Sequence, residues 1–170
     1  MRNSIIIFVI GGILGIAGGF GLGIFVYPYI FLADVVATEE VMGAEDMEIV
    51  ATGTFIHANP SDPIHYGMGS VTVYNDVVHL EKDFKVGPGP KFHVYLVTTD
   101  NVTSSADVQN SSIVDLGRLH AFQGSQNYPV AQTITLPDYG SVVIWCEQFG
   151  VLISPAALAF GDNAGANNPS

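Results

Sequence analysis

The sequence is short of cysteine and of basic residues, and both shortages narrow what the chain can be. The single cysteine, Cys146, excludes an internal disulfide, so a folded domain must be held together by its hydrophobic core. Only 5 Lys and Arg residues accompany 16 Asp and Glu residues, for a net charge of −11. Because such a surface repels phosphate backbones, we expect no nucleic-acid partner. The sequence also lacks CxxC, Walker, GxSxG and HExxH motifs, which mark dithiol, nucleotide, hydrolase and zinc-protease sites.

A long uncharged stretch lies close to the start of the chain. Residues 3–33 have no charged side chain, and residues 5–32 are apolar except for glycines, one proline and two tyrosines. A helix of that length measures about 42 Å, against about 30 Å of bilayer hydrocarbon. We therefore predict a transmembrane anchor at 5–32 that contacts lipid and follows a stub at 1–4. The alternative is a cleaved signal peptide, whose apolar region usually covers only about 7–15 residues.

The charges on either side of this span predict its orientation. Arg2 precedes the span, whereas the first basic residue after it is Lys82. The acidic residues of the connector are Asp34, Glu39, Glu40, Glu45, Asp46 and Glu48. The positive-inside tendency therefore places the N-terminus in the cytoplasm and the rest outside. The chain is predicted to be a single-pass protein of the cell membrane, with its domain in the periplasm if the source is bacterial.

Glycines recur at every fourth position within the span. They are Gly11, Gly15, Gly19 and Gly23. This spacing places them on one stripe of a helix, where the backbone of a second helix can approach closely. The stripe favours self-association, although glycine is also generally common in membrane helices.

The remainder of the chain has the pattern of an all-β domain. Short alternating runs separated by Gly and Pro, with almost no helical periodicity, predict an antiparallel β-sandwich or a barrel-like domain at 49–160. A polar linker at 33–48 precedes it, and a disordered tail at 161–170 follows. Two alternating runs on either side of Asn75 and Asp76 predict a hairpin, with His79 on its solvated side. Further strands are expected within 49–57, 92–98, 113–122, 130–136 and 141–153.

Cys146 lies in the most apolar of these runs. Alternation places Cys146 on the same face as Ile144, and places Trp145 and Glu147 on the other face. Because a buried, unpaired Glu147 would be costly, we expect the Trp145 face to be half covered and the Cys146 face to point inward. One interpretation of Cys146 is a small core residue. The other is a redox thiol, or a metal or haem ligand.

The histidines invite a metal interpretation together with Cys146. They are His57, His65, His79, His93 and His120. A blue-copper site in its familiar form has a His and a Met shortly after its Cys, and neither residue type follows Cys146. We therefore predict no metal site and assign no cofactor.

A combination of motifs extends across both halves of the β-rich region. The first half contains His65, Gly69, Val71, Val73, Tyr74, Phe84, Gly89, Pro90 and the run 94–96. The second half contains Leu116, Gly117, Leu119, the run 124–128, Tyr139 and the run 142–151. Over roughly 49–158 the chain resembles the DM-thirteen family. The resemblance implies an all-β domain outside the cytoplasm, an electron-transfer role and a candidate redox thiol at Cys146. Where the family commonly has an acidic residue after Gly-Pro, this chain has Lys91.

Two functional hypotheses remain open at this point. The first is an anchored redox module that exchanges electrons with a partner protein through Cys146, with residues 124–128 as an exposed loop beside an opening to the thiol. Its candidate binding residues are His65, Gln126, Asn127, Tyr128 and Trp145. The second is a non-catalytic binding or structural β-domain with Cys146 in its core and residues 124–128 as part of an exposed recognition loop.

Overall fold

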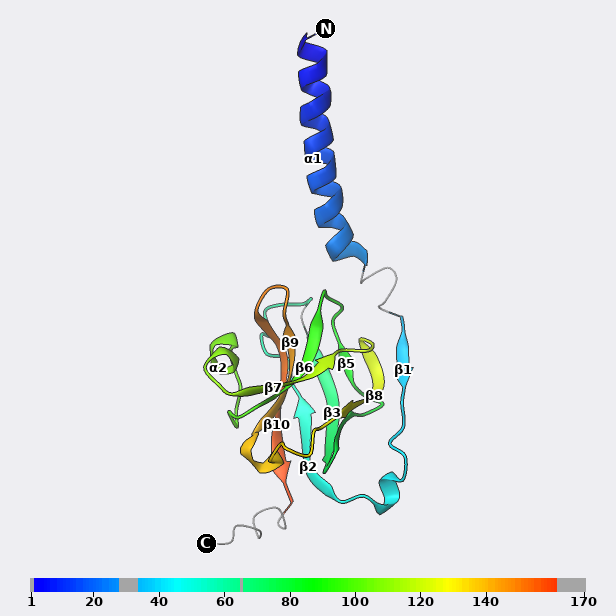
Figure 1. The fold of residues 1–170 in the computed structure, drawn as a ribbon, viewed down its shortest axis with the longest axis vertical. Coiled ribbons are helices and arrows are strands. Elements are labelled where there is room, and N and C mark those ends of the chain that lie inside the picture. Colours follow the sequence, from blue (N-terminus) through cyan, green and yellow to red (C-terminus); the bar gives the residue numbers. More distant parts are fainter. Residues whose placement is uncertain (1, 28–33, 65, 162–170) are drawn as a thin grey trace.

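The computed structural model describes residues 2–27, 34–64 and 66–161 (Figure 1). Helix α1, Arg2–Tyr27, extends away from a β-domain that contains nearly all of the other described residues. The stretch Asn3–Ile24 is long and apolar enough to cross a membrane, and none of it is buried. A helix fit to span a bilayer therefore lies where the sequence predicts the anchor.

The β-domain is built on one ten-stranded sheet. Its strands are β1 Val36–Thr38, β2 Ile49–Phe55, β3 Gly67–Tyr74, β4 Val77–Leu80, β5 Lys85–Val86, β6 Phe92–Val97, β7 Ile113–Arg118, β8 Gln123–Pro129, β9 Ser141–Cys146 and β10 Val151–Phe160. Three short helices, η2 Ala44–Asp46, α2 Ser105–Gln109 and η3 Leu136–Asp138, lie in the connections.

The strands follow the order β1-β8-β4-β3-β2-β10-β9-β6-β7, and β5 pairs with both β3 and β8. Every pair is antiparallel except β1 with β8. The predicted all-β, sandwich-like class is confirmed. Among the described residues the path of paired strands is not closed into a barrel.

The predicted hairpin is confirmed, but its solvated face is not. Strands β3 and β4 pair in the register Val73↔Val78 around the turn at Asn75 and Asp76. His79 was expected to be solvated and is only 7% exposed. The reason is that β8 pairs with β4 on its other edge and places Asn127 opposite His79.

Two polar segments form strands that the apolar pattern does not predict. β8 occupies Gln123–Pro129, whereas the strand predicted within 130–136 is absent from the described chain. β1 lies inside the segment expected to be a linker and pairs in parallel with β8. Both strands carry polar residues whose partners lie far away in the sequence.

Strand β9 is buried along its whole length and separates two apolar clusters. Ile144 and Cys146 belong to the larger cluster, which fills the main core. Trp145 belongs to a smaller cluster, together with Tyr95 and Val108. Val108 lies in α2, whose N-terminus is fixed by a capping box, so this helix helps to cover the Trp145 face. The expected inward orientation of the Cys146 face is confirmed.

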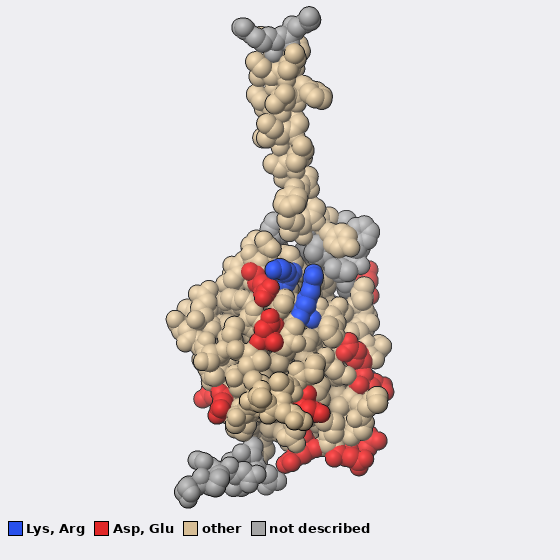
Figure 2. Space-filling model, viewed as in Figure 1, with Lys and Arg blue, Asp and Glu red and all other residues tan. Residues whose placement is uncertain are grey.

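The surface charge of the domain is uneven. Figure 2 shows Lys and Arg gathered at the end of the visible face nearest α1, with Asp and Glu in separate patches beside them and along the sides and far end of the domain. Lys91 and Arg118 line a pocket between this end of the domain and α1.

Candidate functional site

The thiol of Cys146 is enclosed at the end of β9. The residue is only 1% exposed, and Sγ donates a hydrogen bond to the Pro90 carbonyl oxygen at 3.3 Å. Next to it, the Glu147 backbone N–H donates to the Lys91 carbonyl oxygen at 3.1 Å. The segment 89–91 therefore lies directly over the thiol.

The surroundings of Cys146 favour the protonated thiol. Burial raises the pKa of Cys146 above its ordinary value, and the negative charge of Glu147 adds to this effect. Hydrogen bonds from the backbone N–H groups of Phe149 and Gln148 act in the opposite direction but do not cancel the rise in pKa. Because the thiolate is the nucleophile, the thiol has low intrinsic reactivity in this position.

The segment 89–91 also lines a pocket. Its volume is about 920 Å³, and its walls come from the domain and from the last turns of α1. The domain side includes Pro90, Phe92 and Leu119, and the helix side includes Phe20 and Ile24. Pro90 is thus both a wall of this mainly apolar pocket and the hydrogen-bond acceptor of Cys146.

The opposite face of β9 carries a cluster of polar and aromatic side chains. The Tyr95 hydroxyl donates to Glu147 Oε1 at 3.1 Å, and the Tyr95 ring stacks on Trp145 with a centroid separation of 6.4 Å. His93 lies between two carboxylates: Nδ1 is 3.0 Å from Asp115 Oδ1, and Nε2 is 3.3 Å from Glu147 Oε2. We call this set, Tyr95, Trp145, His93, Asp115 and Glu147, the Tyr95 cluster.

Three members of the Tyr95 cluster, His93, Asp115 and Glu147, could together hold a metal ion. Each offers one ligand atom, and these atoms lie within 4.8 Å of one another. Each ring nitrogen of His93 already faces one carboxylate, and the Lys91 ammonium lies 3.4 Å from Glu147 Oε2. The sequence places His93 and Tyr95 on one face of a strand, but it does not reveal their partners.

A family model described as electron transfer DM13 matches residues 61–158. The chain belongs to this DM13 family. The resemblance inferred from the sequence motifs is thereby confirmed, and the matched region includes both Cys146 and the Tyr95 cluster. No curated protein and no solved structure matches the chain.

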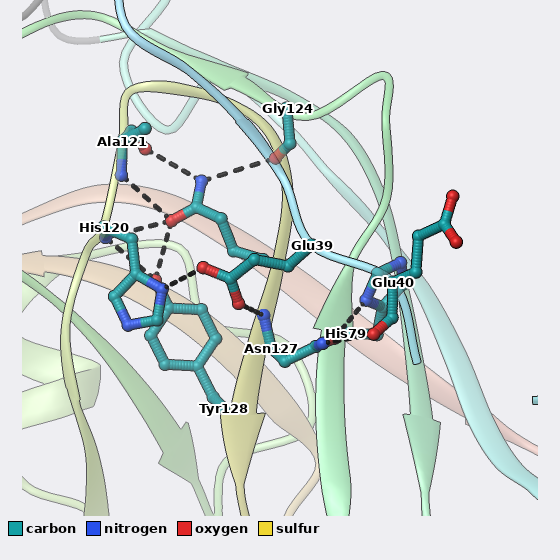
Figure 3. A network of polar contacts seen from close by, with 9 residues as sticks. Glu39, Glu40, His79, His120, Ala121, Gly124, Asn127 and Tyr128 are labelled. Atoms are coloured by element: carbon teal, nitrogen blue, oxygen red, sulfur yellow. Dashed lines mark hydrogen bonds and ion pairs between the residues drawn. The ribbon is translucent and has the colours of Figure 1, made fainter. Parts of the chain in front are cut away.

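In the DM13 domain, the segment predicted to be an exposed loop at 124–128 is part of strand β8. Gln126 is fully buried and makes five hydrogen bonds (Figure 3). Its Oε1 accepts from the Tyr128 hydroxyl at 2.8 Å and from the backbone N–H groups of His120 and Ala121. Its Nε2 donates to the carbonyl oxygens of Ala121 and Gly124. Gln126 and Tyr128 thus tie β8 to the loop before it.

Asn127 connects β8 to the chain that follows β1 (Figure 3). Its side-chain oxygen accepts from His79 Nδ1 at 2.6 Å, and its amide nitrogen donates to the Glu40 carbonyl oxygen at 2.9 Å. The Glu39 carboxylate accepts from the Asn127 backbone N–H at 2.8 Å and from His120 Nδ1 at 2.7 Å. This network holds the connector behind α1 against the DM13 domain.

The predicted site residues therefore do not form one site. Within the described parts of the chain, no hydrogen bond joins Gln126, Asn127 or Tyr128 to Cys146. Trp145 is next to Cys146 in sequence but faces the other cluster. His65 lies outside the described residues. The expected opening beside residues 124–128 is a wrong prediction, because this segment is a strand and the segment over the thiol is 89–91.

Proposed function

We propose that this DM13 protein is an electron-transfer module held by α1 on the outer side of the cell membrane, with Cys146 as its redox group. The family description supports electron transfer, and Cys146 is the only cysteine in the chain. The observation that carries the proposal is the contact of Cys146 with Pro90, which accepts the hydrogen bond of the thiol and also lines a pocket beside α1.

A lone thiol limits the chemistry of this module. Without a second cysteine, Cys146 forms no internal disulfide, so its oxidised form is a sulfenic acid or a mixed disulfide with a partner protein. The alternative is that the thiolate holds a bound metal that carries the electron. In the mixed-disulfide route, the Cys146 thiolate attacks a partner disulfide, the departing partner sulfur takes up a proton, and one S–S bond replaces another. Access requires the segment 89–91 to move, since Cys146 is covered in the structure.

Labelling of the thiol in the intact membrane protein tests this role. We expect a small alkylating reagent to modify Cys146 faster than the domain unfolds, and a Cys146→Ser variant to keep its fold and lose electron exchange with a redox partner. If modification is no faster than unfolding and Cys146→Ser exchanges electrons normally, Cys146 has no redox role.

The membrane position has its own test. We expect a reporter fused to the C-terminus to be active only outside the cytoplasm, because Arg2 precedes the span and an acidic connector follows it. We also expect the protein to stay in the membrane after a carbonate wash. A soluble product that begins near Thr38 would instead show that the helix is a cleaved signal sequence, which meets the same length and composition criteria.

A second candidate function is a non-catalytic binding or structural β-domain. The observation that favours it is the enclosure of Cys146. The residue is buried among apolar side chains, and its thiol donates a hydrogen bond to the Pro90 carbonyl oxygen. In that case Cys146→Ser alters stability alone, and the labelling experiment separates the two functions.

A further inference from the structure

The Tyr95 cluster contains the features of a redox-active tyrosine. Tyr95 is only 6% exposed, and its ring stacks on Trp145 at an interplanar angle of 26°. Its hydroxyl donates to the carboxylate of Glu147, which is itself partly exposed. A buried phenol next to a second oxidisable ring and a proton acceptor is an arrangement that core packing alone does not require.

The ionisation of Tyr95 determines how the residue can lose an electron. Burial raises the pKa of Tyr95 far above its ordinary value, and the hydrogen bond to Glu147 and the charges of Asp115 and Glu147 add to the rise. Tyrosinate is therefore not formed at physiological pH. An oxidised phenol is strongly acidic, so removal of an electron from Tyr95 requires an acceptor for its proton.

Glu147 is placed to take that proton and to pass it on. One carboxylate oxygen accepts from Tyr95, and the other faces His93 Nε2 at 3.3 Å and Lys91 Nζ at 3.4 Å. Beyond His93 lies the exposed carboxylate of Asp115, 3.0 Å from Nδ1. The polar contacts thus run from the buried phenol to the surface.

Tyr128 shows by contrast what the carboxylate adds. Tyr128 is also buried, and burial also raises its pKa. Its hydroxyl donates to the side-chain amide of Gln126 at 2.8 Å. Because an amide oxygen does not take a proton at physiological pH, the hydrogen bond of the Tyr128 hydroxyl does not lead to a base.

We propose that Tyr95 is a one-electron redox site of the domain, with Glu147 as its proton acceptor and Trp145 as the adjoining aromatic group in the electron path. In the oxidation step, Tyr95 gives one electron to a one-electron acceptor, either a metal complex or the oxidised cofactor of a partner protein. The phenolic O–H bond breaks, and its proton forms a new O–H bond on Glu147. The products are a neutral tyrosyl radical, a neutral carboxylic acid and the acceptor reduced by one electron. The proposal rests on the electron-transfer function proposed above.

The test is oxidation of the full chain in detergent micelles by hexachloroiridate(IV), followed by rapid freezing and electron paramagnetic resonance. We expect a tyrosyl signal in the parent and in Tyr128→Phe, and its loss in Tyr95→Phe. Glu147→Gln keeps the hydrogen-bond acceptor but removes the base, which makes Tyr95 resemble Tyr128. We expect this variant to form the radical about 100-fold more slowly, on the scale of a lost general base. The slowing of the parent reaction in D₂O should also disappear in Glu147→Gln.

Several outcomes overturn the proposal. It fails if the parent gives no tyrosyl signal, if Tyr95→Phe keeps the signal, or if Glu147→Gln reacts as fast as the parent. Circular dichroism of each variant shows whether the fold is retained, and the isotope effect distinguishes a lost base from a merely disturbed fold.

Cys146→Ser separates this proposal from the proposed function. If Cys146→Ser abolishes electron exchange with a partner while Tyr95→Phe leaves it intact, the thiol acts alone and Tyr95 is no redox site. If Cys146→Ser still forms the Tyr95 radical and exchanges electrons, the phenol is the redox site and the role of the thiol is refuted.

Discussion

Replacing Gln126 by Leu should destabilise the domain strongly, although the two side chains have similar volumes. The amide satisfies two buried groups of Ala121, the N–H at 3.1 Å and the C=O at 2.8 Å, and the Tyr128 hydroxyl at 2.8 Å. Leu satisfies none of them, and each buried unpaired group costs about 1–3 kcal/mol. Allowing for local relaxation, we expect a loss of about 4 kcal/mol, which is exceptional for one substitution.

Urea denaturation followed by the fluorescence of Trp145, the only tryptophan, measures this loss directly. Gln109→Leu is the matched control, because Gln109 is exposed and makes one long hydrogen bond to the Gly150 carbonyl oxygen at 3.3 Å. We expect the control to change stability by less than about 0.5 kcal/mol. A loss of under about 1 kcal/mol in Gln126→Leu would refute the reasoning, since water or a rearranged loop would then satisfy the orphaned groups.

Three further predictions concern backbone, thiol and helix. Gly69→Ala should destabilise more than Gly117→Ala in the same denaturation assay: both glycines have positive φ, of 106° and 122°, but an added Cβ meets the backbone of Phe84 only at Gly69. Burial raises the pKa of Cys146 above its ordinary value, so the stability that the protonated thiol contributes is present below the pKa of the unfolded thiol and declines as the pH rises above it. Cys146→Ala should flatten this alkaline decline in melting temperature, and an unchanged slope contradicts the prediction. Changing Gly15 and Gly19 together to Ile should weaken helix self-association by about 1 kcal/mol, as measured by fluorescence energy transfer between labelled chains in a bilayer. If the variant and the parent show equal energy transfer, the glycine stripe does not drive self-association.

The sequence predicts strands best where one face is apolar and the other polar. The alternation in β3 and β4 predicts their hairpin, and the apolar run before Cys146 predicts the buried strand β9. It fails for β8, whose buried side chains include the polar residues Ser125 and Gln126. The Gln126 amide bonds the Tyr128 hydroxyl and backbone groups of the preceding loop, whereas Ser125 Oγ has no hydrogen-bond partner among the described residues. From the sequence alone, a polar residue such as Gln126 is expected in a loop. Its burial is explained only by the backbone groups to which its amide is hydrogen-bonded. Its partners depend on tertiary structure, which alternation does not encode.

The same distinction holds for the candidate site. Alternation correctly places Cys146 and Trp145 on opposite faces, because this requires only the pleat of one strand. The bond between Tyr95 and Glu147 joins residues 52 positions apart, and it depends on the register of β6 against β9. That register is not contained in either strand alone. The thiol was therefore identified from the sequence and the phenol was not.

Lys91 connects the two faces of β9. It is the only described residue other than glycine with positive φ, of 53°, and its carbonyl oxygen accepts from the Glu147 backbone N–H. The segment that it ends covers the Cys146 thiol, while its ammonium group lies 3.4 Å from the carboxylate that accepts the Tyr95 proton. A movement of this segment that uncovers the thiol would also move the Lys91 ammonium group away from the Glu147 carboxylate. Access to Cys146 and proton transfer from Tyr95 would then depend on the same three residues, 89–91.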